Sequence, residues 1–147
     1  MKSKPIFFSV LLSSVFLFSC EKEEVVSETD LPTPAKEFIA LHFTNQTIAN
    51  VVKEKDILEK KFTYEVTLGN GTSLDFDQQG SVTEIDGTQT KLPDSIIPAK
   101  IAQYVHTTYA NDYIVGWEKE GENQDIELNT QLELRFDKNN DFVSIQD

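Results

Sequence analysis

The sequence of 147 residues predicts an α+β protein, in which a unit of one helix and a four-stranded antiparallel sheet is duplicated in tandem, in two layers. The first observation behind this prediction is an internal repeat, since alternating apolar positions in the middle of the chain recur near its end. The second is an amphipathic helical stripe before each copy. The third is an N-terminal export signal, which is removed on export, so that only the residues after it form the fold. We therefore expect four parts: residues 1–20, 21–30, 31–91 and 92–147.

Residues 1–20 are expected to be a lipoprotein signal peptide. Lys2 and Lys4 precede an apolar run that is too short to span a membrane, which needs about 20 apolar residues. The run ends in Leu-Phe-Ser-Cys, a lipobox that closes on Cys20, the single cysteine of the chain. This pattern predicts that the exported protein begins at a lipidated Cys20. An ordinary signal peptide with a coincidental cysteine is the alternative.

Residues 21–30 are expected to form a flexible acidic tether. They open with Glu21, Lys22, Glu23 and Glu24, a run that resembles the export signal of surface lipoproteins of Bacteroidetes. The prediction is an outer-membrane lipoprotein exposed at the cell surface. The alternative is a merely solvated charged linker on a lipoprotein that faces the periplasm.

Each repeat unit is expected to open with a helix, because apolar side chains recur along one helical face. In the first copy these positions are Ala35, Phe38, Ile39, His42 and Phe43, and in the second Ile101, Tyr104, Val105, Thr108 and Tyr109. Pro34 and Pro98 fit a first helical turn, where the missing N–H group costs no hydrogen bond.

Antiparallel strands are expected after each helix, and the turn between the middle strands decides their register. A two-residue Asn-Gly turn would place Asp75 opposite Val66, on the apolar face. A three-residue loop, Gly69-Asn70-Gly71, instead places Leu74 opposite Val66. We therefore predict the three-residue loop.

The second copy is expected to repeat this hairpin, with Ile126 opposite Leu134. Residues 48–55 and 114–119 are the expected first strands of the two units.

A polar turn over residues 77–80 is expected to close the next hairpin. Asp77 and Gly80 stand where a type I turn prefers them, and Asn140 replaces the glycine in the second copy. The acidic residues here also fall at the spacings of a calcium-binding EF-hand loop. Strands flank the segment where helices are required, and the last ligand position is Asp86 rather than glutamate. A polar hairpin turn is therefore the prediction.

The repeat also resembles a known family. Residues 65–82 read EVTLGNGTSLDFDQQGSV and follow a Leu-Pro pair and an aromatic helix. In these features the chain is similar to the PepSY-like, β-lactamase-inhibitor-like lipoproteins of Bacteroidetes. The second copy departs from the turn pattern, with Thr130, Gln131 and Asn140 in place of the glycines and asparagine. The resemblance covers residues 31–147 and implies tandem helix-plus-four-strand units with a fold-level similarity to a secreted β-lactamase inhibitor.

The net charge of −12 argues against nucleic acid and anionic membrane surfaces as partners. The most acidic segment is expected to be a solvated hairpin, and an acidic patch for a basic partner is the alternative. Its acidic members are Glu118, Glu120, Glu122, Asp125 and Glu127.

Three other side chains are candidates for a functional role. His42 and His106 stand on different predicted helices without a cluster of cysteine or acidic ligands, which favours a structural role over a metal or catalytic one. Trp117 aligns with Val51, which favours a buried position over an exposed binding hot spot.

The sequence predicts a protein without enzymatic activity. No nucleophile elbow or phosphate-binding glycine loop occurs, and no thiol follows Cys20, so we predict no catalytic, cofactor-binding or metal-binding residue. We expect instead a binding module that is held at the outer membrane by its lipid anchor and contacts an unidentified protein or peptide. The family resemblance implies an inhibitor-like role. The alternative is a small ligand or a cation, calcium, in a groove between the two halves.

Overall fold

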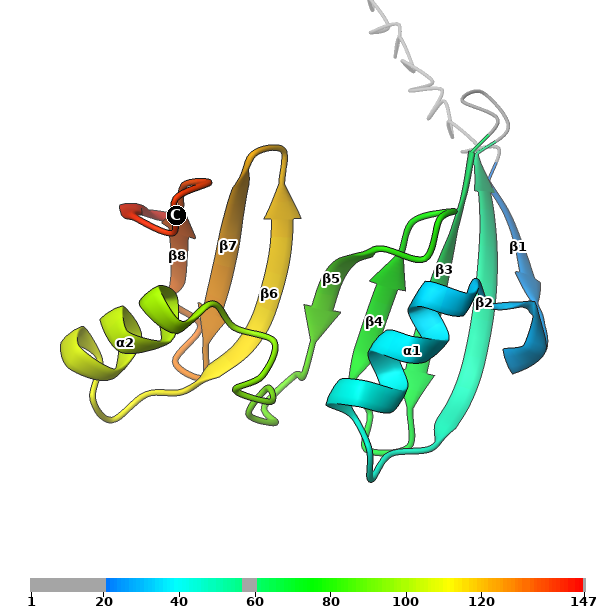
Figure 1. Cartoon of the computed structure of the whole chain (residues 1–147), viewed down its shortest axis with the longest axis horizontal. Helices are drawn as coiled ribbons and strands as arrows, with labels where there is room; N and C mark the ends of the chain where they lie inside the picture. The colour runs from blue at the N-terminus through cyan, green and yellow to red at the C-terminus, as the bar shows by residue number, and fades with distance from the viewer. Residues whose placement is uncertain (1–20, 57–60, 147) are drawn as a thin grey trace, which may run out of the picture.

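The structure, a computed structural model, describes residues 21–56 and 61–146 of the chain (Figure 1). The expected signal peptide over residues 1–20, with Cys20, lies outside these described residues. Within the described ranges no helix is long and apolar enough to cross a membrane.

The helices and strands follow one another in a regular order. The first half contains β1 (Glu21–Val25), the 3-10 helix η1 (Glu28–Asp30), α1 (Thr33–His42), β2 (Ile48–Asp56), β3 (Lys61–Leu68), β4 (Ser73–Phe76) and β5 (Val82–Asp86). The second half contains α2 (Ala99–Thr108), β6 (Ile114–Glu120), β7 (Asn123–Leu128), β8 (Glu133–Phe136) and β9 (Phe142–Gln146).

All nine of these strands form one antiparallel sheet, in the order β1 to β9, and the two α-helices lie over it (Figure 1). The predicted tandem duplication of helix-plus-four-strand units is therefore wrong as a description of the architecture. The protein has helices and an antiparallel sheet, but the sheet is single and continuous.

The physical reason for this correction is the pairing of β5 with β6. Glu84 lies opposite Glu118, and Ile85 lies opposite Trp117. Two separate sheets would each leave an edge whose N–H and C=O groups have no partner. Joining β5 to β6 satisfies both edges at once, and a sequence repeat contains no information about such a junction.

Residues 21–30 are ordered, in contrast to the expected flexible tether. Strand β1 pairs with β2 along its whole length, up to Val25 opposite Val52. The 3-10 helix η1 then begins with a capping box, in which the Ser27 hydroxyl accepts the N–H of Thr29 and the Asp30 carboxylate accepts the N–H of Ser27. The pairing partner of β1 lies far along the chain, so local composition did not reveal this strand.

The two α-helices bury the faces that their apolar stripes predict. Ile39 is buried on α1, and Ile101 and Val105 are buried on α2. Pro34 lies in the first turn of α1, as expected, whereas Pro98 precedes α2 as its N-cap residue.

The predicted hairpin register is confirmed in both halves. Val66 lies opposite Leu74, and Ile126 lies opposite Leu134. Gly71 has a φ of 88° in the first loop, and Gln131 adopts the same left-handed backbone in the second, with a φ of 66°.

One row of side chains runs across the sheet beneath the helices and forms the centre of the core. Most of its members are fully buried and belong to a single hydrophobic cluster that includes both helices. In strand order from β2 to β9 the row is Val51, Val66, Leu74, Ile85, Trp117, Ile126, Leu134 and Ile145.

Candidate functional site

The face of the sheet opposite the helices carries an unbroken row of carboxylates. Five acidic residues lie directly opposite one another on five successive strands, β3 to β7. They are Glu65, Asp75, Glu84, Glu118 and Asp125. Side chains alternate along a strand, and each of these residues stands next to a member of the apolar row, so the carboxylates share the opposite, polar face.

A second acidic row lies beside the first. Asp86 is opposite Gly116, Gly116 is opposite Glu127, and Glu127 is opposite Glu133. We call the two rows together the acidic face. It contains eight carboxylates and crosses the junction between the two halves of the molecule, so neither half contains it alone.

A shallow depression of about 150 Å³ lies in the middle of the acidic face. Gly116 forms its floor, and a Cβ atom at this position would lie 2.9 Å from the Cβ of Glu127. A side chain at residue 116 would therefore collide with Glu127. Its acidic lining consists of Glu84, Asp86, Glu118, Asp125, Glu127 and Glu133.

The crowding of carboxylates changes their proton affinities. Burial, with the neighbouring charges of Glu84 and Glu65, raises the pKa of Asp75 from 3.8 to about 6. Burial and the charge of Glu84 likewise raise the pKa of Glu118, and burial and Asp125 raise that of Glu133. In all three cases burial is the largest cause of the raised pKa, and the negative charge of neighbouring carboxylates adds to it.

Arg135 neutralises one end of the acidic face. Its guanidinium contacts both carboxylate oxygens of Asp125, at 2.8 Å from Nε and 2.5 Å from Nη2. The hydrogen bond to Asp125 raises the pKa of Arg135. Asp125 is only 4% exposed, so this bidentate pair satisfies a buried charge. Among the described residues, Glu84 and Glu118 form no ion pair of this kind.

The described residues contain no preformed metal site, since no three His, Cys, Asp or Glu side chains converge on one point. His42 is half-buried, and its Nδ1 lies 2.9 Å from the hydroxyl of Ser95, within hydrogen-bonding distance. His106 is exposed on α2, and the two histidines do not form a joint site.

The loops with EF-hand spacing are hairpin turns, as predicted. The Asp77 carboxylate accepts backbone N–H groups from Gln79 and Ser81 at 2.9 and 2.8 Å, between strands β4 and β5. This oxygen therefore closes the turn, and no helix flanks the loop.

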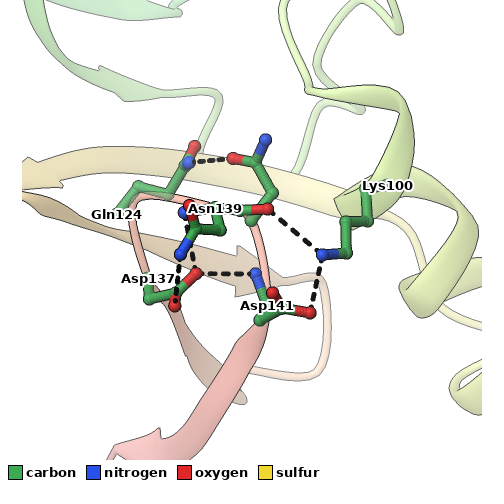
Figure 2. A network of polar contacts seen from close by, with 6 residues as sticks. Lys100, Gln124, Asp137, Asn139 and Asp141 are labelled. Atoms are coloured by element: carbon green, nitrogen blue, oxygen red, sulfur yellow. Dashed lines mark hydrogen bonds and ion pairs between the residues drawn. The ribbon is translucent and has the colours of Figure 1, made fainter.

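The equivalent turn in the second half is shown in Figure 2. Asp137 accepts the N–H groups of Asn139 and Asp141 at 2.8 and 2.9 Å, and these hydrogen bonds lower the pKa of Asp137. Lys100 on α2 reaches over to the turn and pairs with Asp141 at 2.6 Å. This ion pair connects the turn to α2, so Lys100 and Asp141 have a structural role here.

The acidic hairpin predicted from the sequence contributes part of the acidic face. Glu118, Asp125 and Glu127 belong to the acidic face. Glu122 instead lies at the turn of the hairpin, where its Oε2 is 3.4 Å from Nζ of Lys138. Trp117 lies in the apolar row and packs partly buried against the core, as expected.

The acidic residues of β3, β4, β5 and β8 were not expected in the site. These are Glu65, Asp75, Glu84, Asp86 and Glu133. The predicted register of the hairpin already implies that Glu65 faces Asp75. The rest of the face depends on the junction of β5 with β6, which no local pattern indicates. The run of Glu21, Lys22, Glu23 and Glu24 lies on β1, and its role as an export signal stays a prediction.

Comparisons with solved structures identify proteins with the same fold. A "putative calcium-regulated periplasmic protein" from Bacteroides thetaiotaomicron is 31% identical, with a TM-score of 0.80 over 85% of this chain and 97% of that one. A putative periplasmic protein of the DUF2874 family from Bacteroides vulgatus is 26% identical, with a TM-score of 0.77 over 85% and 97% of the two chains. Another from the same species is 29% identical, with a TM-score of 0.80 over 86% and 100%. No curated protein matches the sequence.

The three structural neighbours are thus all described as putative periplasmic proteins, and all three come from Bacteroides. A family model also matches residues 62–144, a region that contains strands β4 to β8 in full, parts of β3 and β9, α2 and the whole acidic face. The extent of this match and the shared fold lead to one conclusion: the chain belongs to the family described as "Putative beta-lactamase-inhibitor-like, PepSY-like".

Proposed function

We propose that this protein is a non-catalytic, lipid-anchored binding protein of the cell envelope, and that its acidic face binds a basic segment of another protein or peptide. One observation carries the proposal, namely the unbroken row of carboxylates across strands β3 to β7. The inhibitor-like family description agrees with a protein as the partner.

The energetic argument starts from repulsion. Like charges directly opposite each other on neighbouring strands destabilise a sheet. The row contains successive pairs of this kind, including Asp75 with Glu84 and Glu84 with Glu118. A partner that supplies lysine or arginine would relieve this repulsion, and the complementary charge would accelerate association.

The shape of the acidic face supports a polypeptide partner. Its depression is shallow, at about 150 Å³, which is below the usual size of a small-molecule pocket, about 300–1,000 Å³. A face that extends over five strands can contact several basic side chains at once.

Calcium is a second candidate ligand for the same face. Eight carboxylates provide the oxygen ligands that calcium prefers, and one structural neighbour carries the description "putative calcium-regulated". The described carboxylates are not arranged as a preformed cage, so calcium binding would require side chains such as Glu84 and Glu118 to converge.

A double variant, Glu84→Gln with Glu118→Gln, tests both candidates. These residues lie opposite each other at the centre of the face, and both are exposed, so the variant should fold. We expect a lysine-rich peptide to bind the variant about five-fold more weakly, because two charge contacts are worth roughly 1 kcal/mol together. The matched control is Glu37→Gln, an exposed acid on α1, which lies on the other side of the sheet.

Isothermal titration calorimetry with the peptide and with calcium chloride separates the two ligands. Heat from the peptide alone supports the polypeptide partner, and heat from calcium alone supports the cation. Equal peptide affinities for the wild type, the double variant and the control would contradict a role of the acidic face.

A further inference from the structure

The open edge of the sheet at β9 is a second surface, separate from the acidic face. Strand β9 corresponds to β5 in the repeat, because each strand closes its half and pairs with the preceding strand in the same register. Leu74 lies opposite Ile85, and Leu134 lies opposite Ile145. Both pairings contain an irregularity at the same position, so β5 and β9 present equivalent outer edges.

These equivalent edges differ in what covers them. Strand β6 pairs with the outer edge of β5, where Trp117 lies opposite Ile85 and leaves it 1% exposed. No strand of the described residues pairs with the outer edge of β9, and Ile145 is 51% exposed. The same position in the repeat is therefore buried by a neighbouring strand in one half and open in the other.

The composition of β9 also lacks the usual protection of an edge strand. Proteins discourage unwanted pairing with charged residues at exposed edges. The opposite edge, β1, reads EKEEV, whereas β9 reads FVSIQ and contains no charge. Phe142 and Val143 are 38% and 53% exposed in addition to Ile145. Of the two edges, β9 is the one suited to accept another strand.

We propose that β9 accepts an extended, basic segment of a partner protein as a tenth strand. The segment would run antiparallel to β9, as β6 does to β5, with a large apolar side chain opposite Ile145 in the role of Trp117. Every second side chain of the segment would lie on the polar face of the sheet, next to Ser144 of β9. Arg135 lies opposite Ser144 on β8, so β9 would separate it from the segment.

Charge complementarity selects a basic segment over a second copy of this chain. The chain has a net charge of −12, so two copies repel each other whereas a basic segment is attracted. Arg135, the cation of β8, is already paired with Asp125 and adds little repulsion.

A labelled peptide with the sequence of β6 provides the probe. It reads IVGWKKK, which is Ile114–Glu120 with Glu118→Lys and Glu120→Lys. Fluorescence anisotropy measures its binding to the purified protein, and a scrambled peptide of the same composition controls for charge alone. We expect Ile145→Lys to weaken binding about ten-fold or more, because it introduces a like charge at the contact. The matched control is Val25→Lys on the opposite edge, where the side chain is 72% exposed.

Hydrogen exchange gives the second measurement. The bound peptide should slow amide exchange in Phe142–Gln146 and leave Glu21–Val25 unchanged. Val143→Lys, at another exposed position of β9, replaces Ile145→Lys if that variant does not fold. Equal binding of the scrambled peptide, equal losses for the two edge variants, or a dimer in light scattering that Ile145→Lys dissociates would each overturn the proposal.

Discussion

At the scale of single residues, the acidic face combines a stability cost with a binding capacity. Asp75 shows the cost most clearly, because it is half-buried between Glu65 and Glu84, both of which are acidic. Its raised pKa means that the folded protein holds the proton of Asp75 more tightly than the unfolded chain does. The stability that protonated Asp75 contributes is therefore fully present at low pH and is lost as the pH rises from about 4 to about 6.

Asp75→Asn should remove this pH dependence. At pH 7.5 we expect the variant to be more stable than the wild type by about 1 kcal/mol, a value reduced for solvent screening because Asp75 is only partly buried. At pH 3.5 the gain should vanish, since the wild-type carboxyl is then protonated. Urea unfolding at the two pH values measures the difference, with Glu37→Gln as a control. The same gain at both pH values would contradict the role of Asp75 charge.

At the scale of elements, the turns connect the helices to the sheet. Gly80 lies in the turn between β4 and β5 with a φ of 85°, and its backbone approaches the start of α1 closely. A Cβ atom there would lie 2.8 Å from the Cβ of Pro32 and 2.9 Å from the nitrogen of Ala35. Gly71 has a similar φ of 88° but has nothing within 4 Å of a Cβ. The two glycines therefore share a backbone conformation and differ in crowding.

This difference predicts unequal effects of alanine. Gly71→Ala should cost about 1 kcal/mol of unfolding free energy, from the left-handed backbone alone. Gly80→Ala should cost at least about 2 kcal/mol, because the added methyl group also displaces the start of α1. Chemical denaturation of both variants provides the comparison. Equal losses would show that the contact with α1 contributes nothing.

The same turns show how much of the fold the sequence could predict. The alternation around Val66 and the glycine at residue 71 determine a hairpin register, because a slip by one residue would bury Asp75. Pairing between distant segments has no such local signal. The pairing of Ile85 with Trp117 joins residues from different repeats. Strands β1 and β2 pair although the whole of α1 lies between them in the sequence. The continuous sheet and most of the acidic face follow from these distant pairings, so both were missed.

At the scale of the whole molecule, the order in residues 21–30 changes how the anchor would act. Strand β1 begins at Glu21, the residue directly after Cys20, and pairs with β2 from its first residue. A lipid on Cys20 would then join a strand of the sheet directly rather than a flexible tether. We therefore expect an anchored protein to be held close to the membrane by its β1 edge, with the β9 edge at the other end of the strand order.

Cys20→Ala tests the anchor directly. The wild type should sediment with the outer membrane, whereas the variant should be found in the soluble envelope fraction, because the thiol that would carry the lipid is absent. Protease treatment of intact cells, followed by mass spectrometry of the released fragments, then distinguishes the two faces of the membrane. Surface display predicts fragments of the folded domain from the wild type. Protection of the domain would place the protein on the periplasmic side, where its acidic face and its β9 edge could contact only periplasmic partners.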